Sequence, residues 1–314
     1  MSDYLPSIGE QKGHSMPRTA EIDIVQKDFP GTDLVLSGLY AEHPNPRALI
    51  VALHGGGLQS GYFDCASAPE LSLLRLGNQL GYSVVALDRP GYGKSAGVRP
   101  SWTLAQQAAT IWSVLAMNFD PAGIGTGICL VGHSFGAMVA TAMAADVPAG
   151  QKVLGLEVSG IAARYAPELA AAFAVHPPAP DSSAVNDAIR VKGRSMHWGD
   201  ERNYPPATFR PGVRPHAQMP GGEPLEAVRW PERVGRIAGA VRAPVHLTLA
   251  GDEPNWVSGE EGLRELSTHF RAARWVVTDI QAGTGHNISL SWAALPYHLR
   301  AIAFFEDCLL AGMR

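Results

Sequence analysis

The stretch "CLVGHSFGAM", residues 129–138, places Ser134 between two glycines directly after a run of apolar, strand-forming residues. A serine hydroxyl is a poor nucleophile near neutral pH, so it needs a base and a rigid setting. A sharp turn from a strand into a helix supplies the setting, because it strains its central residue and leaves no room for side chains two positions away. Gly132 and Gly136 meet that steric demand. The stretch therefore predicts a nucleophile at Ser134, and the alternative is a serine that only caps the helix.

A second glycine-rich stretch, "LHGGG" at residues 53–57, follows the predicted strand "ALIVAL". Backbone without side chains can bring amide hydrogens against a substrate oxygen. We expect the amide of Gly56 and the amide of Phe135 to form the two halves of an oxyanion hole. A flexible turn is the alternative interpretation of the glycines. His54 precedes them and is expected to order the loop rather than to act as a base.

The base is expected late in the chain, in the stretch "QAGTGHNISLSW" at residues 281–292. It places His286 in a glycine-flanked loop between the last predicted strand and the last predicted helix. Loops at the carboxyl ends of strands are where a parallel sheet assembles its sites. His286 is therefore the predicted base, and a solvent-exposed loop histidine is the alternative. His133 neighbours the serine, but its side chain is expected to face the core.

An acid should orient the imidazole, and the stretch "LAGDEPNW" at residues 249–256 offers two. Counting three residues from the end of the strand favours Glu253, whereas the shorter side chain favours Asp252 on the usual geometry. The sequence leaves both open as the acid. Glu157, inside an earlier predicted strand, is a third carboxylate that needs a buried partner. We expect it to form a structural ion pair.

Apolar periodicity predicts an alternation of strands and helices, which indicates an α/β fold with a mostly parallel, doubly wound sheet. The predicted strands are 21–29, 33–42, 47–54, 82–88, 127–133, 152–160, 243–251 and 274–280, and the predicted helices are 71–81, 103–119, 135–147, 259–270 and 292–311.

The alternation stops between about residues 161 and 240, which are rich in Pro, Arg and aromatic residues. A segment of this length inside an α/β domain is typical of a lid or cap, and helices are expected only at 167–175 and 183–191. The predicted core therefore consists of residues 21–160 and 241–314. Residues 1–20 are expected to form a flexible arm.

Composition narrows the class of protein. The chain has 314 residues, 46% hydrophobic and 17% charged, with a net charge of −4 and scattered basic residues, so nucleic acid is an unexpected partner. No apolar run is long enough to span a bilayer and no signal peptide is evident, which predicts a cytoplasmic protein with no membrane partner. The three cysteines, Cys65, Cys129 and Cys308, lie too far apart to suggest a disulfide framework or a metal site. The sequence leaves open whether the protein forms a homodimer.

With these residues assembled, the chain from about residue 21 to 312 resembles the α/β-hydrolase fold superfamily, in particular its serine esterases and lipases. The order Ser134, acid, His286 is the order of that fold. The stretch "LDRPGYGKS" at residues 87–95 is a further hallmark, and the resemblance implies that its Asp88 serves a structural turn. The acid motif departs from the common Gly-x-x-Asp form, which leaves the identity of the acid in doubt.

The resemblance implies a serine hydrolase that acts on a small ester, lactone or thioester without a metal or an organic cofactor. An acyltransferase and a C–C bond hydrolase use the same triad and stay as alternatives, as does a biosynthetic cyclase in which the serine only donates a hydrogen bond. A ligand receptor built on the same fold is the non-enzymatic alternative, because a fold does not fix a function. An epoxide or haloalkane hydrolase is disfavoured, since those relatives carry an aspartate at the nucleophile position.

Overall fold

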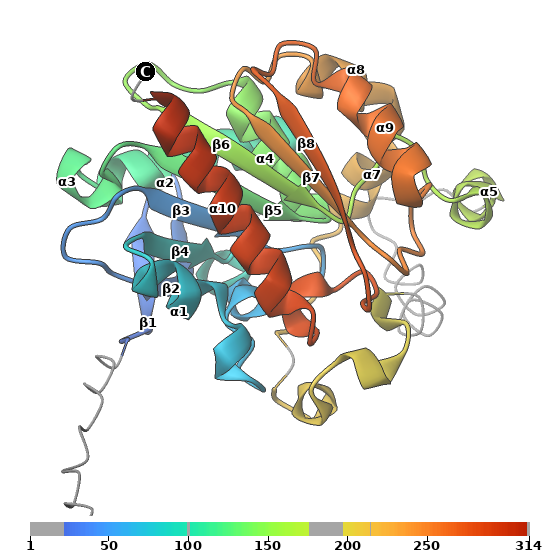
Figure 1. The fold of residues 1–314 in the computed structure, drawn as a ribbon, viewed down its shortest axis with the longest axis horizontal. Helices are drawn as coiled ribbons and strands as arrows, with labels where there is room; N and C mark the ends of the chain where they lie inside the picture. Colours follow the sequence, from blue (N-terminus) through green and yellow to red (C-terminus); the bar gives the residue numbers. More distant parts are fainter. Residues whose placement is uncertain (1–21, 99–100, 176–196, 214, 313–314) are drawn as a thin grey trace, which may run out of the picture.

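The computed structural model describes residues 22–98, 101–175, 197–213 and 215–312 (Figure 1). Eight strands of these residues form one sheet in the order β1-β2-β4-β3-β5-β6-β7-β8. The strands are β1 (Val25–Pro30), β2 (Val35–Ala41), β3 (Leu49–Leu53), β4 (Ser83–Leu87), β5 (Ile128–His133), β6 (Val153–Ser159), β7 (Val245–Ala250) and β8 (Val276–Gln281).

The sheet is parallel except at its beginning. Strand β2 pairs antiparallel with both β1 and β4, and every later pairing is parallel. Parallel strands need crossover helices, so both faces of such a sheet are covered and its strands are apolar throughout. In β3, Leu49, Val51 and Leu53 face one core, whereas Ile50 and Ala52 face the other.

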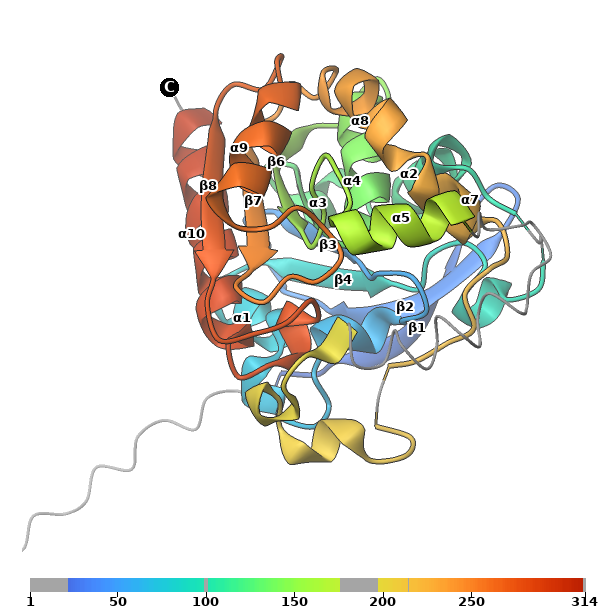
Figure 2. The same ribbon diagram turned by 90° about the vertical axis from the view of Figure 1, so that its right-hand side faces the viewer.

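Helices cover both faces of the sheet (Figures 1 and 2). Helices α1 and α10 pack on one face, and α2, α4, α8 and α9 pack on the other. The helices are α1 (Leu73–Gln79), α2 (Leu104–Asn118), α3 (Pro121–Ile124), α4 (Phe135–Ala145), α5 (Pro167–Val175), α7 (Glu223–Val228), α8 (Trp230–Ala238), α9 (Gly259–His269) and α10 (Ala294–Gly312), with short 3₁₀ turns at Ser60–Phe63, Pro69–Leu71, Gly93–Ser95, Glu201–Asn203, Pro206–Phe209 and Ile288–Leu290.

The predicted fold class is confirmed: the sheet is mostly parallel and doubly wound. Sequence periodicity missed three helices, α3, α7 and α8. Helix α8 lies inside the segment predicted as a lid, yet its Val234 and Ile237 join the same core cluster as the residues of α4. The predicted arm 1–20 and the predicted helix 183–191 lie outside the described residues.

None of the helices in the described ranges combines the length and the apolar character needed to cross a bilayer.

A buried ion pair links the strands β6 and β7. Glu157 is fully buried, and one of its carboxylate oxygens lies 2.6 Å from Nδ1 of His246, while the other accepts a hydrogen bond from the hydroxyl of Thr248. Asp279 of β8 lies 2.7 Å from Nε2 of the same imidazole. Burial lowers the pKa of His246, but the two carboxylates raise it by more, to about 9. Glu157 therefore has the structural role expected of it.

This pair predicts a loss of stability in alkaline solution. Because the folded-state pKa of His246 lies above its unfolded value, the protonated imidazole stabilises the fold fully below about pH 6.5, and this contribution disappears as the pH rises through about 9. We expect the free energy of unfolding to fall by up to about 3 kcal/mol over that range. Urea unfolding of the wild type and of His246→Gln at pH 6, 7.5 and 9.5 measures this change in the free energy of unfolding. An identical pH dependence in both proteins would contradict the assignment.

Candidate active site

Ser134 occupies the sharp turn between β5 and α4. Its φ of 53° and ψ of −123° lie in a region that residues with side chains rarely adopt. A Cβ atom on Gly132 would lie 2.5 Å from Cα of Ala137, and a Cβ atom on Gly136 would overlap the carbonyl oxygens of Leu53 and His54. The two glycines therefore let the strand and the helix approach closely enough to hold the serine in this strained position.

We expect Gly136→Ala to lower the free energy of unfolding by about 3 kcal/mol or more, at the upper end of the cost of overpacking, because the overlapping atoms are backbone oxygens of Leu53 and His54, at the end of β3, and cannot rotate away. Gly123→Ala, in the short helix α3, is the matched control, since the added methyl group meets only a side-chain oxygen 3.4 Å away. Chemical unfolding of both variants measures the difference. Equal stabilities would show that the turn tolerates a side chain.

Three side chains from three different loops meet at the carboxyl edge of the sheet. The hydroxyl of Ser134 lies 3.0 Å from Nε2 of His286, and Nδ1 of that imidazole lies 2.9 Å from each carboxylate oxygen of Glu253. A carboxylate only accepts hydrogen bonds, so Nδ1–H is the donor to Glu253, and Nε2 is left to accept from the serine. The arrangement can move a proton from the serine hydroxyl to a neutral, oriented imidazole.

The two adjacent acids have different surroundings. Glu253 is only 6% exposed, and its Oε1 also accepts a hydrogen bond from the backbone N–H of Asn255 at 3.1 Å. Asp252 is exposed to solvent. The structure therefore brings Glu253, and not Asp252, against His286, three residues after the end of β7.

The glycine loop predicted to supply one amide of the oxyanion hole lies beside the serine. A Cβ atom on Gly55 would lie 3.1 Å from Cβ of Ser134, so the 55–57 loop abuts the nucleophile turn. The N–H of Gly57 donates to the hydroxyl of Tyr92 at 3.0 Å. Within the described residues, the N–H groups of Gly56 and of Phe135 donate no hydrogen bond. Neither of these two donors is therefore committed to a partner among the described residues.

The other histidines near the serine are held in place by neighbours. His133 is fully buried, stacks on Tyr62 with ring centroids 4.5 Å apart, and lies with Nδ1 3.3 Å from the hydroxyl of Ser159. Burial and the nearby His286 lower its pKa well below the ordinary value. His54 is fully buried too: its Nδ1 contacts the carbonyl of Gly55, and its Nε2 accepts a hydrogen bond from the backbone N–H of Arg89. Neither ring reaches the serine hydroxyl by a hydrogen bond.

His197 is a residue that sequence reasoning did not place at the site. Its ring centroid lies 5.3 Å from that of His286, and its Nδ1 accepts a hydrogen bond from the side chain of Asn255 at 3.1 Å. The side chain of Asn287 donates to its carbonyl at 3.3 Å. Burial and His286 lower its pKa to about 4. No motif surrounds His197 in the sequence. Only the folded chain shows that this residue, which belongs to the segment predicted as a lid (residues 161–240, hereafter the insertion), contacts both the acid loop and the base loop.

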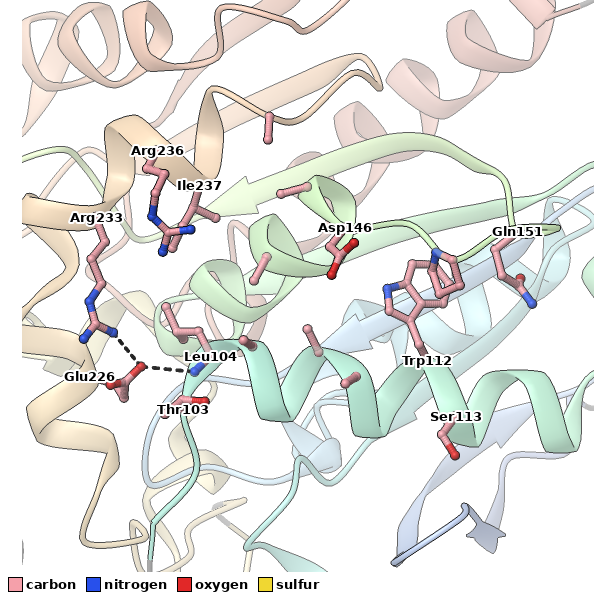
Figure 3. A pocket seen from close by; sticks show the side chains of 18 of the residues that line it. Thr103, Leu104, Trp112, Ser113, Asp146, Gln151, Glu226, Arg233, Arg236 and Ile237 are labelled. Carbon is pink, nitrogen blue, oxygen red and sulfur yellow. Dashed lines mark hydrogen bonds and ion pairs between the residues drawn. The ribbon is translucent and has the colours of Figure 1, made fainter.

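The structure also has a hollow away from Ser134, His286 and Glu253. A groove of about 820 Å³ runs between α2, α4 and α8, and none of the described residues that line it belongs to the group Ser134, Glu253 and His286 (Figure 3). Much of its lining is alanine. At one end Glu226 accepts hydrogen bonds from the backbone N–H of Leu104 at 3.1 Å and from Arg233 at 2.8 Å. This groove is therefore separate from the site formed by Ser134, His286 and Glu253.

Among the described residues, no group of three or more His, Cys, Asp or Glu side chains has the arrangement of a metal site. Cys65, Cys129 and Cys308 are all buried and free.

The chain belongs to the alpha/beta hydrolase family, whose model matches residues 50–295. The resemblance drawn from the motifs is thereby confirmed. No curated protein sequence matches the chain.

Solved structures share the fold at low sequence identity. A carboxyl esterase from Bacillus coagulans is similar with a TM-score of 0.63 and 18% identity over 92% of this chain and 100% of that one. An esterase from Thermogutta terrifontis has a TM-score of 0.60 and 15% identity over 91% and 99%. A proline iminopeptidase from Mycobacterium smegmatis has a TM-score of 0.57 and 18% identity over 92% and 100%. Because their names cover both ester and peptide substrates, the likeness carries the fold and not the substrate.

Proposed function

We propose that the protein is a serine hydrolase that cleaves a carboxylic ester, a lactone or a thioester through a covalent acyl-enzyme on Ser134. The observation that carries the proposal is the continuous hydrogen-bond chain from the Ser134 hydroxyl through His286 to Glu253. A serine–imidazole–carboxylate chain with a buried imidazole and carboxylate and a partly exposed serine at a strained turn is the arrangement that nucleophilic acyl transfer needs.

In the first half of the reaction, Nε2 of His286 takes the proton of Ser134 as the serine oxygen attacks the substrate carbonyl. Glu253 holds the Nδ1–H and stabilises the imidazolium that forms. The imidazolium then gives the proton to the leaving alcohol or thiol, and the acyl group stays on the serine. In the second half, His286 takes a proton from water, the hydroxide attacks the acyl-enzyme, and the acid is released as the serine regains its proton.

Negative charge develops on the carbonyl oxygen in both halves. The free N–H groups of Gly56 and Phe135 are the donors proposed for it, and the start of α4 adds the positive end of the helix dipole. Losing one such donor costs about 10²- to 10³-fold in turnover in serine hydrolases. The two amides therefore belong to the catalytic machinery as much as the side chains do.

Ester-type substrates fit the proposal because an oriented serine with two free amides suits an activated acyl group, and esterases are among the structural neighbours. The insertion would set the acyl specificity, since His197 lies beside His286 and Met219 lies over Gly56. Three of the alternatives differ from this reaction in the attacking group or the leaving group: an acyltransferase, a C–C bond hydrolase and a cyclase. A ligand receptor would bind a substrate without converting it.

Hydrolysis of a panel of substrates tests the proposal. We expect turnover of p-nitrophenyl esters, with a preferred acyl length, and of at least one lactone or acyl-thioester. Parallel assays with a primary alcohol measure acyl transfer by the yield of the new ester. If no ester, lactone or thioester is hydrolysed by folded protein above the rate of Ser134→Ala, the proposed reaction is wrong.

A further inference from the structure

A buried ion pair contacts the glycine-rich stretch at residues 53–57, called the glycine loop below. Arg89, from the stretch "LDRPGYGKS", and Glu223, the first residue of α7, are both fully buried. Nη1 of Arg89 lies 2.5 Å from Oε1 of Glu223, and Nη2 lies 3.2 Å from Oε2. Burying two charges is expensive, and an apolar pair of similar volume is often as stable, so the ion pair calls for a role beyond stability.

Nη1 of Arg89 also donates to the side-chain oxygen of Gln107 at 2.7 Å, whereas Nε and Nη2 donate to the backbone of the glycine loop. Nε donates to the carbonyl of His54 at 2.7 Å, and Nη2 donates to the carbonyl of Gly55 at 3.3 Å. The backbone N–H of Arg89 donates to Nε2 of His54 at 3.1 Å. Because Nε2 is an acceptor in a neutral ring, Nδ1 carries the proton and donates to the same carbonyl of Gly55 at 2.8 Å. The backbone N–H of Leu58 also donates to this carbonyl, at the longer distance of 3.4 Å. Arg89, His54 and this turn therefore fix the direction of the Gly55 carbonyl together.

The direction of this carbonyl fixes the direction of the next amide. The peptide group between Gly55 and Gly56 is planar and trans, so its C=O and its N–H point in opposite directions. Glycine on both sides offers little resistance to rotation of such a group. Hydrogen bonds that hold the Gly55 oxygen on the Arg89 side therefore aim the Gly56 N–H away from it, toward the site.

The cluster of Arg89, Glu223 and Tyr92 also contacts residues on both sides of the proposed oxyanion hole. The guanidinium carbon of Arg89 lies 4.9 Å from the ring centroid of Phe135, which carries the second donor. The hydroxyl of Tyr92 accepts from the N–H of Gly57 at 3.0 Å and donates to Oε2 of Glu223 at 2.6 Å. Glu223 thus holds both Arg89 and Tyr92, and each of them contacts the loop.

Resting on the proposed function, we infer that Arg89, held by Glu223, is a positioning residue that sets the orientation of the Gly55–Gly56 peptide and so presents the Gly56 amide to the oxyanion. The stretch "LDRPGYGKS" then does more than make a turn. Because α7 follows a segment whose Ala217 N–H donates to the carbonyl of Gly57 at 2.9 Å, the insertion is connected to the oxyanion hole through this cluster.

Arg89→Lys tests the inference, because lysine retains the charge opposite Glu223 but lacks the planar fork that reaches two carbonyls at once. With p-nitrophenyl butyrate, we expect kcat to fall by about 10- to 100-fold, less than the loss of a whole donor, while KM stays within about twofold. An alkyl trifluoromethyl ketone forms a tetrahedral oxyanion adduct with a reactive serine. Its Ki should rise by the same factor as kcat falls.

Tyr92→Phe is the second variant, since it removes a single hydroxyl and keeps the ion pair. We expect kcat to fall about 10-fold and the Ki of the trifluoromethyl ketone to rise about 10-fold. The chain offers a matched control in a second tyrosine–glutamate–arginine cluster, remote from the site: the hydroxyl of Tyr82 donates to Glu306, which also pairs with Arg47. Tyr82→Phe and Arg47→Lys should change the midpoint of thermal unfolding but neither kcat nor Ki.

The outcomes separate this inference from the proposed function. If the trifluoromethyl ketone does not inhibit the wild type, the proposed function fails. If it inhibits the wild type, and folded Arg89→Lys and Tyr92→Phe have unchanged kcat and Ki, the positioning role is wrong while the function stands. Should Arg89→Lys fail to fold, Tyr92→Phe alone decides. Equal losses in the Tyr82 and Tyr92 variants would also overturn the inference, because they would show a general effect of stability.

Discussion

Ser134→Ala is expected to lower kcat for p-nitrophenyl esters by about 10⁴- to 10⁶-fold, with KM nearly unchanged. The reason is that the hydroxyl supplies the atom that forms the acyl-enzyme, while the surfaces that bind the substrate stay in place. Some acceleration over water should remain, because the amides of Gly56 and Phe135 still stabilise an oxyanion. Steady-state kinetics of the purified variant measure the loss.

Ser267→Ala on α9 is the control, because its hydroxyl donates only to the carbonyl of Arg264 in the same helix. It should keep the wild-type kcat. A loss of less than about tenfold in Ser134→Ala, or about 1.4 kcal/mol in the barrier, would argue against an acyl-enzyme. That result would favour the alternative in which the serine only donates a hydrogen bond to a cyclising substrate.

The second large effect is expected from Glu253→Gln, at about 10⁴-fold in kcat, as when the acid of a serine–histidine–acid triad is replaced by its amide. The carboxylate accepts from Nδ1–H of His286 through two oxygens 2.9 Å away. A glutamine can turn its amide nitrogen toward the ring, which stabilises the tautomer with the proton on Nε2. That tautomer cannot accept the proton of the serine.

Asp252→Asn is the natural control, since Asp252 is the neighbouring acid, is exposed, and differs from Glu253 in not touching the imidazole. We expect its kcat to stay within about twofold of the wild type, as surface substitutions away from a site have small effects. The opposite ranking of the two variants in kcat would show that Asp252 moves onto His286 in the working enzyme. Circular dichroism of both variants checks that the fold is retained.

Much of the fold could be predicted because its signals are local. Apolar runs of strand length and helical periodicity located all eight strands and the helices that cover the sheet, apart from α8. Helix α8 was missed because it lies in a stretch whose Pro and Arg residues obscure its apolar face, of which Val234 and Ile237 become buried only against α4.

The site divides in the same way. Ser134 and Gly56 could be predicted because the glycines around them answer a steric demand of the neighbouring turn. His286 could be predicted because it lies in the loop after the last strand. The choice between Asp252 and Glu253 depends on the direction of one loop, which no local pattern encodes. The pair Arg89 and Glu223 is separated by 134 positions, and His197 meets Asn255 across 58, so these contacts follow from tertiary packing alone.

Covalent labelling by a fluorophosphonate tests the central claim most directly, because this reagent reacts with a serine whose hydroxyl is activated by an adjacent base. We predict time-dependent loss of esterase activity, incorporation of one equivalent by intact mass, and peptide mapping of the adduct to Ser134, with no labelling of His286→Ala. Wild-type protein that is folded and stays unlabelled, or that carries the adduct on another residue, would contradict the account.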